Sequence, residues 1–246
     1  MTFSEEQKRI IDDTSRQQLI VACPGSGKTT VLLAKVNRMV ERGLSNIAVI
    51  TFTKEAAVEL ETRFKRDYGR TGIYFGTVHA MCYSILRDYR KLSLNSVLTL
   101  KDKRDILHEY DEKLFRRKLS EKEIKEAIDY IGKARNTDSR YEDNVPPFLS
   151  AAKIYNEKEM WARLCRCYDA RKKELLKIDF EDMLIRCRED MQKDRDLLSR
   201  CQMRFQHLLV DEFQDINPLQ SKIIYILTGR NGSLTVVGDY DQSIYG

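Results

Sequence analysis

The stretch LIVACPGSGKTT, from Leu19 to Thr30, decides the fold class of this chain. It opens with a short apolar run that is typical of a buried strand, and it ends with small residues and a Lys-Thr pair. The residues that follow, VLLAKVNRMV, carry apolar side chains at helical spacing. A strand, a small-residue turn and a helix that begins with Lys-Thr form the pattern of a phosphate-binding P-loop. An ordinary glycine turn is the alternative, and GSGKT in this context is unusual by chance.

The chemistry of such a turn assigns roles to its residues. Gly25 and Gly27 let the backbone come close to phosphate oxygens, and the amide groups at the start of the helix face an anion. Lys28 is expected to reach the β- and γ-phosphates of ATP, and the Thr29 hydroxyl to hold Mg²⁺. The motif usually opens with glycine, and here Ala22 stands in that place. The expected nucleotide-binding residues are Ala22, Cys23, Pro24, Gly25, Ser26, Gly27, Lys28, Thr29 and Thr30.

Composition narrows the class of protein. The 246 residues suffice for one large domain or two small ones, and 42% hydrophobic with 33% charged residues predicts a soluble globular chain. Its apolar runs are too short to span a membrane, and the N-terminus does not read as a signal peptide. Six scattered cysteines without a C-x-x-C pair favour reduced thiols and a cytoplasmic location over a zinc site or disulfides. A net charge of +5 is compatible with a nucleic-acid partner but does not require one.

The predicted elements alternate up to about residue 90. Ser4 and Gln7 form a capping box for a helix to about residue 14. Further helices are expected at 28–42 and 54–68 and strands at 47–52 and 72–76, with Thr77 capping the helix that follows. This alternation predicts a parallel sheet with crossover helices.

A charged block with helical periodicity interrupts the pattern from 92 to 177. It holds 20 Lys and Arg against 16 Asp and Glu, and Trp161 in it is expected to be a core residue. Alternation then resumes with helices at 179–200 and 218–227 and strands at 207–212 and 233–239. We therefore expect an α/β domain of residues 1–91 and 178–246 and an inserted all-helical subdomain of residues 92–177.

A second chemical motif, LLVDEFQD, spans Leu208–Asp215. Its apolar strand ends in Asp211 and Glu212, so the carboxylates should emerge where α/β sheets bind ligands. We expect Asp211 to hold Mg²⁺ through water and Glu212 to polarise the water that attacks the γ-phosphate. The pair favours hydrolysis over phosphoryl transfer to a small molecule, whereas the alternative is a surface acidic cluster.

These motifs together resemble the UvrD/Rep family of superfamily 1 helicases. The DEFQD sequence is similar to motif II of that family, and VVGDYDQSIYG (236–246) is similar to motif III. AVITFTKEAAVELETRF resembles motif Ia, FGTVHAMCYSILR resembles the next DNA-contacting motif, and KIDFEDML resembles the return from the helical insertion. The resemblance covers nearly all of 1–91 and 178–246, whereas the helical block matches only in position and character. It implies a RecA-like P-loop NTPase fold for the α/β part.

The resemblance implies roles for further residues. Phe3 and Gln7 match an adenine-reading motif, and the capping box of Gln7 is compatible with that role. Gln242 is implied to sense the γ-phosphate and to link it to DNA. A packing or capping role for His79 is an equal alternative to a DNA contact. The implied DNA-binding residues are Phe52, Thr53, Lys54, Thr77, His79 and Tyr245.

Two departures from the family pattern bear on these roles. Lys54 and Glu55 stand where the family usually has Asn-Lys, which puts the DNA contact there in question. Thr30 stands where many members carry arginine, which removes a cation beside the nucleotide. The family's remaining motifs, which lie in a second RecA-like domain with arginines for the γ-phosphate, are absent from these 246 residues.

The resemblance implies an ATP-dependent DNA helicase that moves 3′ to 5′ on single-stranded DNA and acts at junctions with duplex DNA. DNA repair in the cytoplasm, without a membrane, is the implied setting. This chain would be the N-terminal ATP-binding half, inactive without the second RecA-like domain of the same full-length chain. A nucleotide-gated DNA-binding module that unwinds nothing and the motor part of a helicase-nuclease remain alternatives.

Overall fold

The structure is a computed structural model, and it describes residues 2–23, 25–137, 139–152 and 154–239. The chain forms two compact units, one of residues 1–85 with 187–246 and the other of residues 86–186. The predicted limits of the helical subdomain, 92–177, fall inside the second unit and stay a prediction. None of the helices in the described part of the chain combines the length and the apolar character needed to cross a membrane.

The first unit contains a sheet in which the paired strands run parallel, in the order β1-β5-β4-β2-β3. Val21 lies opposite Gly238, and Ile50 lies opposite both Val210 and Gly76. All carboxyl ends therefore share one edge of the sheet, and the predicted α/β class is confirmed. The strands are β1 (Gln17–Val21), β2 (Ile47–Ile50), β3 (Tyr74–Gly76), β4 (His207–Val210) and β5 (Ser233–Gly238).

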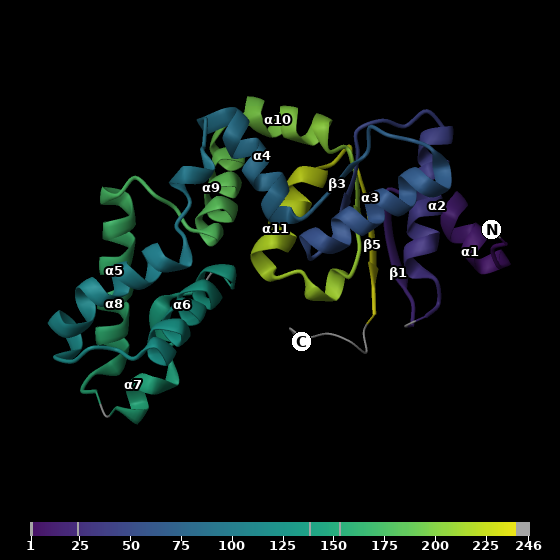
Figure 1. The fold of residues 1–246 in the computed structure, drawn as a ribbon. Coiled ribbons are helices and arrows are strands. Elements are labelled where there is room, and N and C mark those ends of the chain that lie inside the picture. Colours follow the sequence, from purple (N-terminus) through teal and green to yellow (C-terminus); the bar gives the residue numbers. More distant parts are fainter. Residues whose placement is uncertain (1, 24, 138, 153, 240–246) are drawn as a thin grey trace. The chain divides into compact units, whose positions relative to one another are not determined.

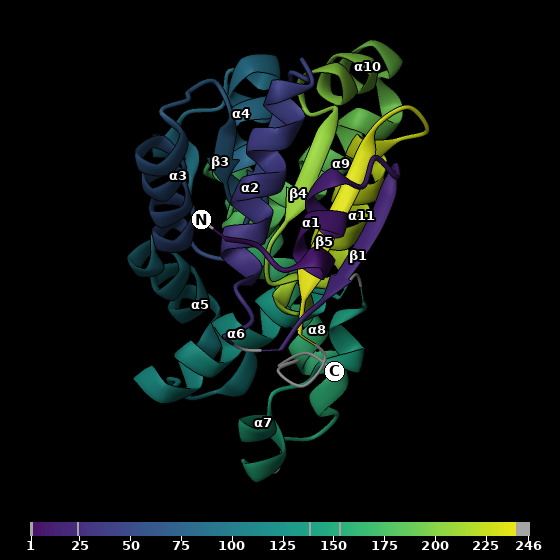
Figure 2. The ribbon, with the colours of Figure 1, turned by 90° about the vertical axis from the view of Figure 1, so that its right-hand side faces the viewer.

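Helices cover both faces of this sheet (Figures 1 and 2). On one face lie α1 (Glu5–Asp12), α2 (Lys28–Glu41) and α3 (Lys54–Tyr68). On the other lies α11 (Pro218–Thr228), which packs against α10 (Arg195–Arg204). The core beneath the first three helices is aliphatic and aromatic, and its buried members are Ile20, Leu32, Leu33, Val36, Met39, Ile47, Val49, Leu60, Phe64, Leu209 and Val237.

Sequence and structure differ where one helix was expected from 179 to about 200. The structure has two helices there, α9 (Phe180–Lys193) and α10. Between them, the Asp194 carboxylate accepts a hydrogen bond of 2.9 Å from the backbone N–H of Leu197. Because an aspartate at this place satisfies amide groups that a helix start leaves open, the chain can begin a new helix without glycine or proline.

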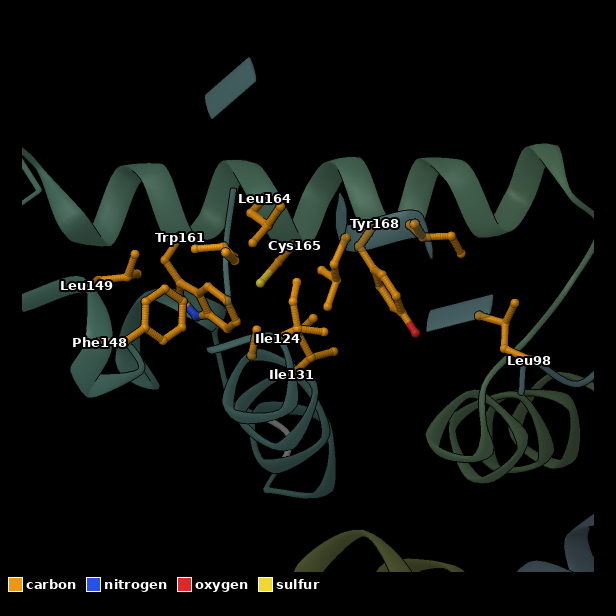
Figure 3. Packing of buried hydrophobic residues seen from close by; sticks show 13 residues of the cluster. Leu98, Ile124, Ile131, Phe148, Leu149, Trp161, Leu164, Cys165 and Tyr168 are labelled. Carbon is orange, nitrogen blue, oxygen red and sulfur yellow. The ribbon is translucent and has the colours of Figure 1, made fainter. Parts of the chain in front are cut away.

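The second unit is helical, with its own core (Figure 3). Trp161 and Tyr168 are almost fully buried in this core, with Trp161 directed toward Ile124 and Tyr168 toward Leu98. This confirms the core role expected for Trp161. The elements are η1 (Leu94–Ser96), α5 (Leu100–Phe115), α6 (Glu121–Asn136), η2 (Tyr141–Asp143), α7 (Pro147–Ala151) and α8 (Glu157–Glu174), and α4 (Val78–Arg90) and α9 contain residues of both units.

The helical unit contains a buried cluster of ion pairs. Arg135 of α6 bonds to Asp169, to both oxygens of Asp179 and to Asp182. The Lys172 ammonium lies 2.8 Å from Asp179 and 2.7 Å from Asp182. These two cations hold the pKa of the buried Asp179 carboxyl far below its usual range, against the opposing effect of burial. The cluster therefore ties the chain after residue 178 to α6 and α8.

Candidate nucleotide and nucleic-acid site

The predicted site residues follow the strands at the shared edge of the sheet. The backbone N–H of Ala22 bonds to the Gly238 carbonyl at 3.2 Å, so this position still belongs to the sheet ladder. The N–H of Asp211 likewise bonds to Ile50, and that of Thr51 to Gly76. Pro24, Gln242 and Tyr245 were also predicted as site residues, and they lie outside the described residues.

The turn after β1 has the backbone expected of a phosphate-binding loop. Gly25 and Gly27 adopt φ values of +77° and +82°, which side chains disfavour, and Gly27 precedes the first residue of α2. Lys28 and Thr29 are the first two residues of that helix. The first turn of a helix leaves amide groups open, and such groups can bind an anion.

The loop and the predicted carboxylates lie together. The Lys28 ammonium is 3.6 Å from the Glu212 carboxylate, although β5 separates β1 from β4 in the sheet. Glu212 itself has φ +48° and ψ +51°, a left-handed conformation that is uncommon outside glycine. The turn after β4 thus brings a carboxylate back to the P-loop lysine.

Asp211 is buried beside this pair, with 6% of its surface exposed. Burial, and after it the negative charge of Glu212, raise the pKa of Asp211 to about 6. Lys28 and Arg63 act in the opposite direction. The Asp211 carboxylate and the Thr29 hydroxyl are oxygen ligands of the kind that Mg²⁺ prefers. The residues present therefore fit a magnesium ion, which Asp211 and Thr29 would hold.

Gln7 contacts the P-loop directly. Its side-chain oxygen accepts the Ser4 N–H at 3.0 Å, which completes the predicted capping box of α1. Its amide nitrogen donates to the Ser26 carbonyl at 3.2 Å. To bind an adenine edge, Gln7 would have to exchange these two contacts for the base.

Arg63 is a residue that motif reading missed. It lies on α3, and its guanidinium donates to the Thr30 hydroxyl at 3.3 Å. Arg63 therefore places a cation beside Thr30, although the arginine that many family members carry at that position is missing. This cation comes from α3, the next helix along the chain. The sequence alone does not predict this contact, because it depends on how α3 packs against α2.

The described residues among the predicted DNA contacts lie at the other half of the same edge, after β2 and β3. Phe52 is 41% exposed, and Lys54 is exposed at the start of α3. The hydroxyl of Thr53 caps α3 through the Ala56 N–H, and that of Thr77 caps α4 through the Ala80 N–H. His79 follows in α4 and is half-buried. Both threonine side chains thus have a capping role beside any DNA contact.

A cavity of about 430 Å³ lies near the carboxyl ends of β1 and β5. It opens beside β1 and β5 on the face covered by α11, and its lining includes Leu19, Val21, Phe213, Gln214 and Tyr225. None of the described residues between Ala22 and Thr30 lines it. Gln214 lines it and bonds to Glu212, so the cavity adjoins the turn after β4.

Fold and site together define a P-loop NTPase domain with a parallel α/β sheet. The sequence model of the UvrD/REP helicase N-terminal domain matches residues 3–246. The chain belongs to this family.

Individual relatives agree with that assignment. The chain is 35% identical to the YjcD protein of Bacillus subtilis strain 168 over 253 aligned positions, which cover 99% of this chain and 32% of YjcD. It is 32% identical to DNA helicase II of Haemophilus influenzae, over 99% of this chain and 34% of that protein. It is 30% identical to the ATP-dependent DNA helicase Rep of Escherichia coli K12, over 100% of this chain and 37% of Rep. The chain thus spans about a third of the length of these relatives.

Proposed function

We propose that this chain is the ATP-binding part of a DNA helicase that couples ATP hydrolysis to movement along single-stranded DNA. The observation that carries the proposal is the 3.6 Å approach of Lys28 to Glu212, which unites a P-loop and a strand-end carboxylate in a chain of the UvrD/REP family. The relatives named as DNA helicases support DNA as the partner.

We propose the following roles for the chain's own residues, which the geometry of the described residues and the family resemblance support. The amide groups after Gly27 and the Lys28 ammonium bind the phosphates, and Gln7 binds the adenine edge. Asp211 and Thr29 would hold Mg²⁺, which when bound would neutralise charge at the phosphates. Glu212 accepts the proton of the attacking water, and Gln242 senses the γ-phosphate. Lys28 releases Glu212 as it turns to the phosphates.

The DNA side of the proposal rests on the second half of the sheet edge. Phe52, Thr53, Lys54, Thr77, His79 and Tyr245 are proposed to contact single-stranded DNA, with movement from 3′ to 5′ and strand separation at junctions with duplex DNA. A second RecA-like domain of the full-length protein would complete the nucleotide site. The proposed setting is DNA repair in the cytoplasm, and residues 92–177 are proposed to form the inserted subdomain.

Titration of the 246-residue chain with Mg²⁺·ADP in a calorimeter tests the nucleotide site. Lys28→Ala should remove most of the binding, because the cation against the phosphates is lost. Lys122→Ala, which deletes an exposed lysine of α6, should bind as the wild type does. Equal affinities for wild type and Lys28→Ala would refute the site.

Hydrolysis separates the proposed motor from a binding module. Arginines from a second domain are worth roughly 10³–10⁵ in rate in other NTPases, so the chain alone should show almost no DNA-stimulated hydrolysis. The full-length protein should hydrolyse ATP with DNA and unwind a forked duplex. Nucleotide binding by the full-length protein without either activity would support a nucleotide-gated DNA-binding module instead.

A further inference from the structure

Gln214 has two hydrogen bonds that no role assigned so far explains. It lies in the short helix η3 (Phe213–Asp215), directly after Glu212. Its side-chain nitrogen donates to the Glu212 carboxylate at 2.6 Å. Its side-chain oxygen accepts the backbone N–H of Asp239 at 3.1 Å. One side chain therefore joins the end of β4 to the end of β5.

The direction of the Gln214 amide is fixed by its partners. A backbone N–H can only donate, so the oxygen of the amide must face Asp239 and the nitrogen must face Glu212. Gln214 and Lys28 both approach the same Glu212 oxygen, Oε2. Among the described residues, Oε1 is then the carboxylate oxygen left to accept a proton from water.

Two backbone features show that this arrangement is built into the strand ends. Glu212 is held in the left-handed region, where a non-glycine residue persists only if its surroundings stabilise it. Gly238, the last residue of β5, approaches Gln214 so closely that a β-carbon there would lie 2.8 Å from the Gln214 oxygen. The absence of a side chain at Gly238 is what leaves room for the amide.

We infer that Gln214 is a positioning residue for the hydrolytic step: it orients the Glu212 carboxylate and ties it to the end of β5. The inference rests on the proposed function, because it takes Glu212 as the group that activates water. Asp239 begins the segment that leads to Gln242, so Gln214 also connects the water-activating carboxylate to the chain that carries the proposed γ-phosphate sensor.

The first test is steady-state ATP hydrolysis by the full-length protein with DNA. Gln214→Met keeps the length of the side chain and removes both hydrogen bonds. Since misplacement of a catalytic group by about 1 Å can cost 10²-fold, we expect kcat to fall roughly 10- to 100-fold. KM for ATP should not change, because the side-chain hydrogen bonds of Gln214 go to Glu212 and Asp239 and not to the P-loop. Gln192→Met, on the exposed part of α9, is the matched control and should leave kcat unchanged.

A substitution at Gly238 is expected to disrupt the same contact of Gln214 independently. The φ of Gly238 is not in the left-handed region, so alanine fits the backbone, and the added methyl group displaces the Gln214 oxygen. Gly238→Ala should therefore lower kcat as Gln214→Met does. The double variant should be no slower than Gln214→Met alone, because the contact is already lost. A general structural defect would instead make the two losses multiply.

The outcomes separate this inference from the proposed function. If Gln214→Met and Gly238→Ala retain wild-type kcat while Glu212→Gln abolishes hydrolysis, the positioning role is wrong and the proposed function stands. If Glu212→Gln also hydrolyses ATP at the wild-type rate, the proposed function itself fails. Melting temperatures of the variants show whether each one is folded, and a folded Gln214→Met with an altered KM and an unchanged kcat also overturns the inference.

Discussion

Asp211 is a proposed metal ligand, and its buried position in the folded chain is unfavourable for a charged carboxylate. Its pKa is raised to about 6, chiefly by burial, above the ordinary value of 3.8. The protonated Asp211 therefore gives its full contribution to stability below about pH 4. This contribution is lost as the pH rises through about 6 and the carboxyl ionises. At neutral pH the ionised Asp211 therefore destabilises the metal-free protein.

Asp211→Asn should raise the stability of the metal-free chain at pH 7.5. Asparagine keeps an acceptor for the Glu212 N–H and carries no charge. A difference of about two pKa units corresponds to a gain on the order of 1–3 kcal/mol. Thermal unfolding in EDTA at pH 7.5 and pH 4.5 measures it, and the gain should be clearly smaller at the lower pH.

Ligand addition provides the control for this substitution. Mg²⁺·ADP should raise the melting temperature of the wild type more than that of Asp211→Asn, because the variant lacks the charged ligand. An equal gain from Asp211→Asn at both pH values would show that ionisation of this carboxyl is not the cause.

Lys54 and Phe52 should contribute to DNA affinity in different ways. A lysine against a phosphate releases a counterion, so Lys54→Ala should flatten the dependence of log affinity on log salt by about one unit. An aromatic face stacks on bases at about 1–3 kcal/mol with little dependence on salt, so Phe52→Ala should weaken binding and leave the slope unchanged. Fluorescence anisotropy with labelled oligo-dT at several salt concentrations separates the two.

Lys65→Ala is the matched control, because Lys65 pairs with Glu61 in the last turns of α3. It should leave both affinity and slope as they are. If Lys54→Ala behaves like this control, the Lys54-Glu55 departure from the family pattern has moved the phosphate contact elsewhere.

At the scale of elements, sequence patterns located helices better than strand ends. The limits of α3 are those predicted, because Thr53 caps its start and Gly69 its end. β2 and β4 end at Ile50 and Val210, earlier than expected, since apolar and acidic residues continue into the ligand-facing loops. The break before α10 was missed because Asp194 lies in a run of charged residues without a helix breaker.

In the candidate site, too, the sequence predicted continuous motifs but not contacts between separate elements. The P-loop and the Asp211-Glu212 pair were predictable because each is a continuous motif next to a strand. Arg63 and Gln214 were not, because their contacts with Thr30 and Asp239 arise only when separate elements pack.

The start of α6 offers a test of capping in the helical unit. Ser120 and Glu123 form a capping box, and Arg117 bonds to Glu123 at 2.6 Å. The hydrogen bond from Arg117 is the main reason that the pKa of Glu123 is lowered to about 2. The ionised Glu123 therefore stabilises the fold above about pH 4.5, and this stabilisation is lost as the pH falls through about 2. Ser120→Ala should cost about 1 kcal/mol at pH 7. Urea unfolding followed by Trp161 fluorescence measures this, and Lys122→Ala on the same helix should cost nothing.

At the scale of the whole molecule, the ionic cluster determines which residues a stable fragment of the helical unit must include. A fragment of residues 92–177 contains Arg135 and Lys172 but lacks Asp179 and Asp182, so two buried cations lose partners. Breaking a buried pair in this way typically costs about 3–5 kcal/mol. A fragment of residues 86–186 keeps the cluster and the whole core around Trp161.

We expect the fragment 86–186 to unfold cooperatively in urea and the fragment 92–177 to show no cooperative transition. Trp161 is the only tryptophan of the chain, so its fluorescence reports on this unit in either fragment. Within 86–186, Asp179→Asn should weaken the transition, which ties the difference to the charges and not to fragment length. Equal cooperativity of the two fragments would show that the cluster is dispensable.

The strand order also governs when the sheet can form during synthesis. Among the described strands, β1 pairs only with β5, and Gln17 lies opposite Leu234. A ribosome makes β1 near the beginning and β5 near the end of these 246 residues, with the helical unit between them. The strand that carries the P-loop therefore waits for its neighbour while most of the chain emerges, and only β2 and β3 can pair early. Pairing across such a distance is slow and leaves an apolar edge open to aggregation. A nascent chain released before residue 233 would expose β1 without a partner, and it would be a substrate for chaperones.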